Sequence, residues 1–198
     1  MTLEQIAAFY IFSLVAAITP GPSNVIIAAT GSSVGMWRGL PCALGCSCGM
    51  ALLLFATALG LGEMVTYHAV LLKAMNWGGA AFLLWLAWKI ASADPGAPAE
   101  AAKPVGFTAA LLFQWINPKA WLVAVGAVGT YLQAGAASQV LQALQFGGLF
   151  FCAALPAGLV WLGLGSMMQR LLTNPRAARI FNVAMGAALA GSVAMILI

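Results

Sequence analysis

Long apolar runs, separated by short polar stretches, repeat along the whole chain. A helix needs roughly 20 mostly apolar residues to cross the hydrocarbon core of a bilayer, and six segments reach that length. We expect the six helices at Gln5–Thr30, Gly39–Leu61, Ala69–Ala91, Val105–Leu132, Ser138–Met168 and Ala178–Ile198. The fifth segment contains Pro156 and is long enough to be kinked or tilted. The pattern therefore predicts an all-α integral membrane protein with six transmembrane helices.

Composition excludes a soluble globular domain. Hydrophobic residues make up 63% of the chain and charged residues 6%, whereas a soluble domain carries about 25% charged residues. The eight Lys and Arg residues are scattered between apolar runs, so the net charge of +4 does not indicate a nucleic-acid partner. The first five residues contain Glu4 and no positive charge, which argues against a cleaved signal and for a retained first helix.

The basic residues indicate how the helices are oriented. Six spans place alternate connections on opposite sides of the membrane. One side then collects six basic residues, namely Arg38, Lys89, Lys103, Arg170, Arg176 and Arg179, and the other side holds Lys73. Because cytoplasmic connections carry the excess of Lys and Arg, we expect the first side to be cytoplasmic and both termini to lie outside.

A weak internal repeat relates the two halves of the chain. The polar, proline-rich stretch 92–104 is interpreted as a linker between repeats at about 1–91 and 105–198, within one transmembrane domain, 1–198. At an offset of 98 residues Pro20 coincides with Pro118 and Phe9 with Phe107, while the third span of each half does not align. A unit of three spans reverses its orientation when it is repeated, so the halves are predicted to be inverted copies.

The segment Thr19-Pro20-Gly21-Pro22-Ser23-Asn24 interrupts the first span. Its two prolines remove two backbone donors and displace the carbonyls one turn earlier, so the helix is expected to break there. Inside a bilayer a broken helix is tolerated where it is buried in protein or lines a cavity. The break would create a helix N-terminus whose unpaired N–H groups suit a carboxylate. The alternative is a kink that serves packing alone.

A second polar segment, Gln114-Trp115-Ile116-Asn117-Pro118-Lys119, interrupts the fourth span. If the repeat holds, both halves break at the same depth and face each other. Lys119 then places a charge inside a span, which costs at least about 2.5 kcal/mol at a helix centre unless the charge is paired or hydrated. Lys119 is therefore a candidate functional residue. The alternative is that it lies near the interface and extends to water.

The remaining polar and small residues are interpreted as structural. The cysteines lie in apolar segments as small core residues, and they are Cys42, Cys46, Cys48 and Cys152. His68 is the only histidine, so neither a metal site nor a cofactor is expected. Interhelical hydrogen bonds are expected from Gln114, Thr57, Gln142, Gln145 and Asn182. Two small-residue pairs suit close helix packing, Gly35 with Gly39 and Gly45 with Gly49.

Together these motifs resemble the LysE/RhtB family of amino-acid exporters, over essentially the whole chain. The resemblance rests on Pro20-Gly21-Pro22, Trp37-Arg38-Gly39-Leu40, Ala43-Leu44-Gly45 and Asn117-Pro118-Lys119-Ala120-Trp121. It implies a six-helix carrier in the bacterial inner membrane that exports an amino acid or a close derivative, driven by the proton or charge gradient. Many members carry Asp where this chain has Ser23, so a neutral substrate is favoured over a basic one. Protons are a candidate coupling ion, but no buried acid is assigned to carry them.

The candidate substrate-binding residues follow from the two interrupted spans, and they are Pro20, Gly21, Pro22, Ser23, Asn24, Gln114, Asn117, Pro118 and Lys119. The substrate carboxylate is expected at Ser23 and Asn24 or at Lys119, and its amino group at carbonyls freed by the prolines. One half rocking against the other would alternate access.

Several alternatives stay open. A transmembrane thiol-disulfide carrier would use the cysteines, and a structural or assembly protein would leave Lys119 unexplained. Homo-oligomers could form through glycine-rich faces. No Gly-Lys-Ser/Thr phosphate-binding loop is present, which argues against direct ATP drive.

Overall fold

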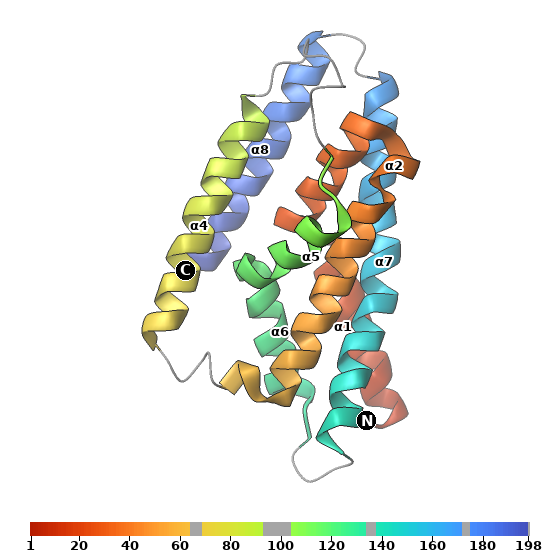
Figure 1. The fold of residues 1–198 in the computed structure, drawn as a ribbon, viewed down its shortest axis with the longest axis vertical. Coiled ribbons are helices and arrows are strands. Elements are labelled where there is room, and N and C mark those ends of the chain that lie inside the picture. Colours follow the sequence, from red (N-terminus) through yellow and green to blue (C-terminus); the bar gives the residue numbers. More distant parts are fainter. Residues whose placement is uncertain (64–68, 93–103, 134–137, 172–174, 198) are drawn as a thin grey trace.

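The computed structural model describes residues 1–63, 69–92, 104–133, 138–171 and 175–197, and nearly all of them are helical (Figure 1). In chain order the elements are α1 (Leu3–Ile18), α2 (Pro22–Ala56), the π-helix η1 (Thr57–Leu61), α4 (Ala69–Ala91), α5 (Phe107–Ile116), α6 (Pro118–Tyr131), α7 (Gln139–Leu171) and α8 (Pro175–Leu197). The prediction of an all-α protein is confirmed for these residues. Most of the expected linker 92–104 lies outside them, as does His68.

Local sequence defines where α1 begins, where it ends and where α2 begins. Thr2 and Gln5 form a capping box, in which the N–H of Thr2 donates to Gln5 Oε1 at 2.9 Å and the N–H of Gln5 donates to Thr2 Oγ1 at 3.3 Å. At the other end Thr19 is extended, the conformation that a following proline favours. α2 begins at Pro22, whose fixed φ suits the first helical position.

The helix α2 reverses direction at Gly35. This residue has φ 79° and ψ 177°, a left-handed conformation that favours glycine. The Thr30 hydroxyl donates to Cys42 Sγ at 3.6 Å, although twelve residues of straight helix would separate the two by about 18 Å. α2 therefore has two legs, 22–34 and 36–56, which run side by side (Figure 1). Gly35 is a turn and not one of a packing pair, so that part of the expectation is wrong.

Two helices among the described residues are long and apolar enough to cross a membrane, Pro22–Leu61 and Gln139–Met168. The pair α5 and α6, bent by 66° at Asn117, qualifies as a third span. The first of these includes the reversal at Gly35, so it contains two legs of opposite direction. The prediction of six spans therefore stays a prediction.

The two halves of the chain interleave. α2 packs along α7, and α4 packs along α8 (Figure 1). Each of these pairs joins one element from the first half to one from the second. The α4–α8 pair meets the other helices at a few positions, among them Val25 of α2 and Pro118 of α6, which lies against Gly79 of α4. The halves consequently do not form two separate bodies.

Glycines allow α2 to approach α5 closely. A Cβ on Gly45 would meet the carbonyl oxygen of Phe107, and a Cβ on Gly49 would lie 2.5 Å from the carbonyl oxygen of Leu111. No side chain larger than hydrogen fits at either position without a shift of the backbone. The expectation that Gly45 and Gly49 serve close packing is confirmed.

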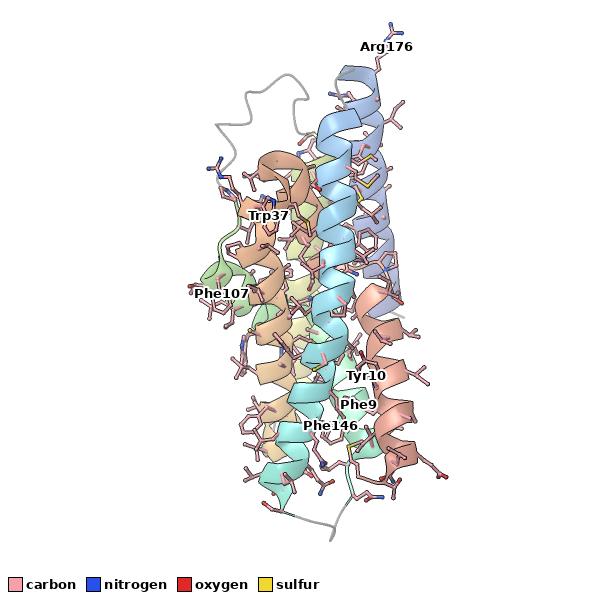
Figure 2. All side chains as sticks on the ribbon, turned by 90° about the vertical axis from the view of Figure 1, so that its right-hand side faces the viewer. Phe9, Tyr10, Trp37, Phe107, Phe146 and Arg176 are labelled. Atoms are coloured by element: carbon pink, nitrogen blue, oxygen red, sulfur yellow. The ribbon has the colours of Figure 1, made fainter. Side chains whose placement is uncertain are left out.

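Of the three apolar clusters in the described residues, two lie beside a cavity. One gathers around Phe9 of α1, which is fully buried and whose ring centroid lies 4.9 Å from that of Phe146 (Figure 2). The other joins both legs of α2 to α5 and α7, through residues such as Ile27, Cys42 and Leu162. Residues of both clusters line one cavity, as described below.

The polar residues inside the apolar segments differ in what they bind. Gln142 exchanges two hydrogen bonds of 3.1 Å with the main chain of Gln133, just beyond α6. Thr57 instead donates to the carbonyl of Leu53 on its own helix, so the interhelical bond expected of it is wrong. Gln145 Oε1 is buried without a hydrogen-bond partner in the described part of the chain.

Candidate functional site

Two short interruptions of helical hydrogen bonding, each followed by a proline, lie between α1 and α2 and between α5 and α6. The first interruption covers residues 19–21, and the second consists of Asn117 alone, which ends α5 and precedes α6. Pro22 and Pro118 each occupy the first helical position after the interruption. The structural counterpart of Pro118 is thus Pro22, which lies 96 residues before it, and not Pro20.

The helix starts after the two interruptions differ in their caps. At α6 the side chain of Asn117 accepts from the N–H of Lys119 at 3.1 Å, so the helix caps itself. At α2 the preceding residue is Gly21, which has no side chain to accept such a bond. In the described part of the chain, the N–H groups of Ser23 and Asn24 in the first turn of α2 donate to no acceptor. The N-terminus of α2 is therefore the one that remains open to an anion.

Side chains from other elements satisfy the carbonyl groups at the end of α1. Asn24 Nδ2 donates to the oxygens of Ala17 at 3.0 Å and Thr19 at 2.8 Å. Trp161 of α7 donates from Nε1 to the oxygen of Ile18 at 3.2 Å. Inside a bilayer these groups would otherwise lack partners. The first interruption is thus closed by α2 and α7 as well as by α6.

The contribution of α6 comes from Lys119. Its Nζ donates to the oxygen of Thr19 at 2.7 Å and to that of Pro20 at 3.3 Å. A cation at the C-terminal carbonyls of a helix is favourably placed in the field of the helix dipole. Gly21 makes room for this side chain, because a Cβ there would lie 2.7 Å from Lys119 Cδ and 2.9 Å from Nζ.

Three uncharged polar side chains join the two interruptions directly. The Ser23 hydroxyl donates to Gln114 Oε1 at 2.9 Å, and Asn117 Nδ2 donates to Ser23 Oγ at 3.0 Å and to Gln114 Oε1 at 3.4 Å. Gln114 and Asn117 are each 2% exposed. We call Ser23, Gln114 and Asn117 the amide network. It ties the start of α2 to the end of α5 at one point in the interior.

A cavity of about 60 Å³ adjoins the amide network and Lys119. Since a water molecule needs roughly 10–15 Å³ measured in this way, the cavity has room for about four to six water-sized groups. Its polar lining comes from Gly21, Ser23, Asn24, Ser47, Gln114, Asn117 and Lys119. Its apolar lining includes Ile27, Met50, Val123, Phe150 and Gly158. A small molecule with one polar end and one short apolar end matches this lining.

Six of the nine residues singled out in the sequence line this cavity, namely Gly21, Ser23, Asn24, Gln114, Asn117 and Lys119. The three prolines do not. Pro20 is exposed and contributes only its carbonyl oxygen, Pro22 begins α2, and Pro118 begins α6 and packs on Gly79. The prolines shape the backbone and do not line the cavity.

Sequence reasoning missed the apolar half of the lining and Ser47. Met50, Val123 and Phe150 are ordinary apolar residues in apolar runs, so no sequence signal separates them from lipid-facing positions. Ser47 donates to the carbonyl of Ala43 one turn earlier. Only its position in the middle of the second predicted span could have drawn attention to it.

The cysteines are free thiols in different surroundings. Cys42 and Cys46 are buried one turn apart on α2, Cys48 is partly buried, and Cys152 is exposed on α7. Cys46 lines the cavity. Within the described residues no group of three or more His, Cys, Asp or Glu side chains is placed to hold a metal ion.

Comparisons with known proteins place these features in a family. The family model described as "LysE type translocator" matches residues 14–198. A cysteine/O-acetylserine efflux protein of Klebsiella pneumoniae is 34% identical over 132 residues, which cover 67% of each chain. The protein of the same name from Escherichia coli K12 is 30% identical over 132 residues, 67% of this chain and 68% of the relative. No solved structure matches the chain significantly.

Proposed function

Because the chain belongs to the LysE type translocator family, we propose that it is a secondary carrier which exports a neutral amino acid or a close derivative across the bacterial inner membrane. The observation that carries the proposal is the cavity between the two interrupted helices. Its lining combines an open helix N-terminus, a lysine and an amide network with apolar side chains. A membrane protein with this lining is suited to hold a small zwitterion.

The carboxylate of the substrate binds at the start of α2. The N–H groups of Ser23 and Asn24 have no capping side chain, and the partial positive charge of the helix N-terminus attracts an anion. The ammonium group of Lys119 lies beside Gly21 at the same cavity and adds a full positive charge. These groups fix one end of the substrate.

The amino group of the substrate binds at the amide network. The carbonyls of Thr19 and Pro20, which the sequence pointed to, already accept from Lys119 and Asn24. On the cavity wall, Ser23 Oγ accepts a single hydrogen bond, from Asn117, and can still accept one from an ammonium group, whereas Gln114 Oε1 already accepts two. Among the described residues no Asp or Glu lines the cavity, so a second cation on a basic substrate would lack a partner there and a neutral substrate is favoured.

Alternating access requires the helices around the cavity to move relative to one another. The six predicted spans as two inverted repeats, 1–91 and 105–198, remain part of the proposal, with interruptions in the first and fourth. Rocking of one half against the other is less well supported, because α2 packs along α7 and α4 along α8. No described residue of α4 or α8 lines the cavity, so the movement that opens it involves the helices that do, namely α1, α2, α5, α6 and α7.

Orientation follows from charge. The turn at Gly35, the end of α4 and the start of α8 lie toward one end of the molecule, and the N-terminus lies toward the other (Figure 1). The first end carries Arg38, Lys89, Arg176 and Arg179. By the excess of basic residues this end is cytoplasmic and both termini are periplasmic.

The names of the relatives supply the first substrates to test. Purified protein in liposomes, loaded with labelled cysteine, O-acetylserine, serine, alanine and lysine, should release neutral compounds faster than protein-free liposomes, and lysine should stay. Repeating the assay with and without a proton gradient tests whether protons are the coupling ion. Release of none of these amino acids, from protein shown to be folded, would contradict the proposal.

A transmembrane thiol-disulfide carrier remains the second hypothesis. Cys46 at the cavity is the observation in its favour, but Cys42 lies one turn away on the same helix and Cys152 is exposed on α7 and does not line the cavity. A variant without the four cysteines should still export serine. If serine export is lost while the variant is present at wild-type levels, the thiols take part in transport.

A further inference from the structure

We infer that Gly158 in α7 limits the size of the side chain that the exported amino acid can carry. The inference rests on the proposed function, because it assigns a role within the same cavity. Gly158 lines that cavity and belongs to a helix with five glycines. The five glycines of α7 have different surroundings, and this difference singles out Gly158.

Two of these glycines are needed for packing. A Cβ on Gly165 would meet the carbonyl oxygen of Ala28, and one on Gly147 would lie 2.9 Å from that of Ala51. Two others, Gly148 and Gly163, have no atom within 4 Å of the Cβ position and do not line the cavity.

Gly158 belongs to neither group. A Cβ there would lie 3.5 Å from Ile27 Cδ1 and 3.7 Å from Ala43 Cβ, which is ordinary van der Waals contact. The fold could therefore accept alanine at this position without a backbone shift. The missing side chain leaves space at the cavity wall, and that space is available to a ligand.

The position along the cavity fits the end of a substrate side chain. Ile27 follows Ser23 by one helical turn, so it lies about 6 Å further along α2 on the same face. At about 1.2 Å per bond, five bonds of an extended chain, as from the carboxyl carbon to the terminal methyl of methionine or O-acetylserine, cover about 6 Å. A substrate whose carboxylate is held at Ser23 and Asn24 would thus bring the far end of a side chain of this length to the gap between Ile27 and Gly158. The site would take neutral amino acids with side chains up to this length.

A methyl group at position 158 should make the rate of export depend on the size of the substrate side chain. A methyl group occupies about the space of one water-sized group, in a cavity with room for about four to six. In an apolar pocket one methylene changes discrimination by roughly 10–200-fold. We expect Gly158→Ala to export alanine and serine at rates within about twofold of wild type. Its export of O-acetylserine and methionine should be at least about tenfold slower than that of wild type.

Two variants control for effects on folding. Gly148→Ala adds the same methyl group to the same helix outside the cavity, and it should export all four compounds like wild type. Ile27→Val removes Cδ1, the atom that the new methyl group would contact. The double variant Gly158→Ala with Ile27→Val should therefore regain export of the larger compounds.

The measurement is release of each labelled compound from liposomes that contain purified protein. An unchanged ratio of large to small substrates in Gly158→Ala would overturn the inference, and so would an equal loss for all four that Ile27→Val does not restore. If wild-type protein releases none of the compounds, the proposed function fails and the role of Gly158 fails with it, whereas an unchanged ratio in a protein that exports overturns the role of Gly158 alone. Retained export with an altered ratio supports both.

Discussion

The Nζ of Lys119 in α6 donates to the carbonyl oxygen of Thr19 at 2.7 Å, and so joins the end of α1 to the start of a helix 100 residues later in the chain. The interaction places a charged side chain at the cavity between the two interruptions, bonded to groups that a continuous helix would have satisfied itself. The acceptors of the Lys119 ammonium group are therefore main-chain carbonyls of the protein, those of Thr19 and Pro20. Lys119 contributes both to the fold and to the cavity.

Replacing Lys119 with methionine should reduce export at least about tenfold. The change keeps the length of the side chain but removes the charge for the substrate carboxylate and leaves the carbonyls of Thr19 and Pro20 with fewer donors. A lost charge-assisted hydrogen bond corresponds to roughly 1.5–3 kcal/mol. Thr130→Ala is the control, since this exposed hydroxyl in α6 bonds only to the carbonyl of Gly126. Export at the wild-type rate by Lys119→Met would rule out its role in binding.

Replacing Ser23 with alanine should weaken both stability and export. Gln114 Oε1 loses the hydroxyl donor, and Asn117 Nδ2 loses an acceptor, at a buried position where such a loss costs about 1–3 kcal/mol. Ser32→Ala on the same leg of α2 is the matched control, because its hydroxyl bonds only to the carbonyl of Ala29. Thermal unfolding in detergent and the release assay measure the two effects. Equal unfolding temperatures for the two variants would show that the amide network does not stabilise the fold.

Replacing Gly21 with alanine should lower export while leaving the amount of folded protein close to wild type. The new Cβ would lie 2.7 Å from Lys119 Cδ, and the flexible lysine can move aside, so the protein folds with Lys119 displaced from Thr19. Gly126→Ala in α6 has no atom within 4 Å of the added Cβ and serves as the control. If both variants export equally well, the path of Lys119 past Gly21 does not matter for transport.

Replacing Gly45 with valine should destabilise the protein by roughly 1–3 kcal/mol, the usual effect of forcing extra volume into a packed contact. The side chain would meet the backbone carbonyl of Phe107, which cannot move aside without shifting α5. Gly129→Val provides the comparison, because the space around Gly129 is open. A lower unfolding temperature for Gly45→Val alone is the expected result.

A reporter fused to the C-terminus should be active only if it works in the periplasm. The prediction follows from the basic residues at the end of the molecule opposite the N-terminus, such as Arg38 and Arg176. Alkaline phosphatase, which requires the periplasm, should be active in the fusion, and a fluorescent protein that requires the cytoplasm should be dark. The reverse pattern would overturn the proposed orientation.

Much of the cavity's polar wall could be predicted from the sequence. Proline acts on its own backbone, so Pro22 and Pro118 mark helix starts whatever surrounds them. Lys119 stood out because a charge is rare in an apolar run. Gly35 was misread as a packing residue, since the sequence of a turn between two apolar runs resembles that of a helix with small residues.

The sequence by itself determined that the chain is helical and apolar, and where its helices are interrupted, because those properties depend on composition and on the backbone chemistry of single residues. Only the tertiary structure decided which groups meet at the interruptions. Lys119 could have bonded to water, to a substrate or to Thr19, and Gly158 could have served packing or lipid contact. Which residues meet across long sequence separations depends on how α2 packs along α7 and how α6 lies beside α1. The local sequence around each residue does not determine this packing.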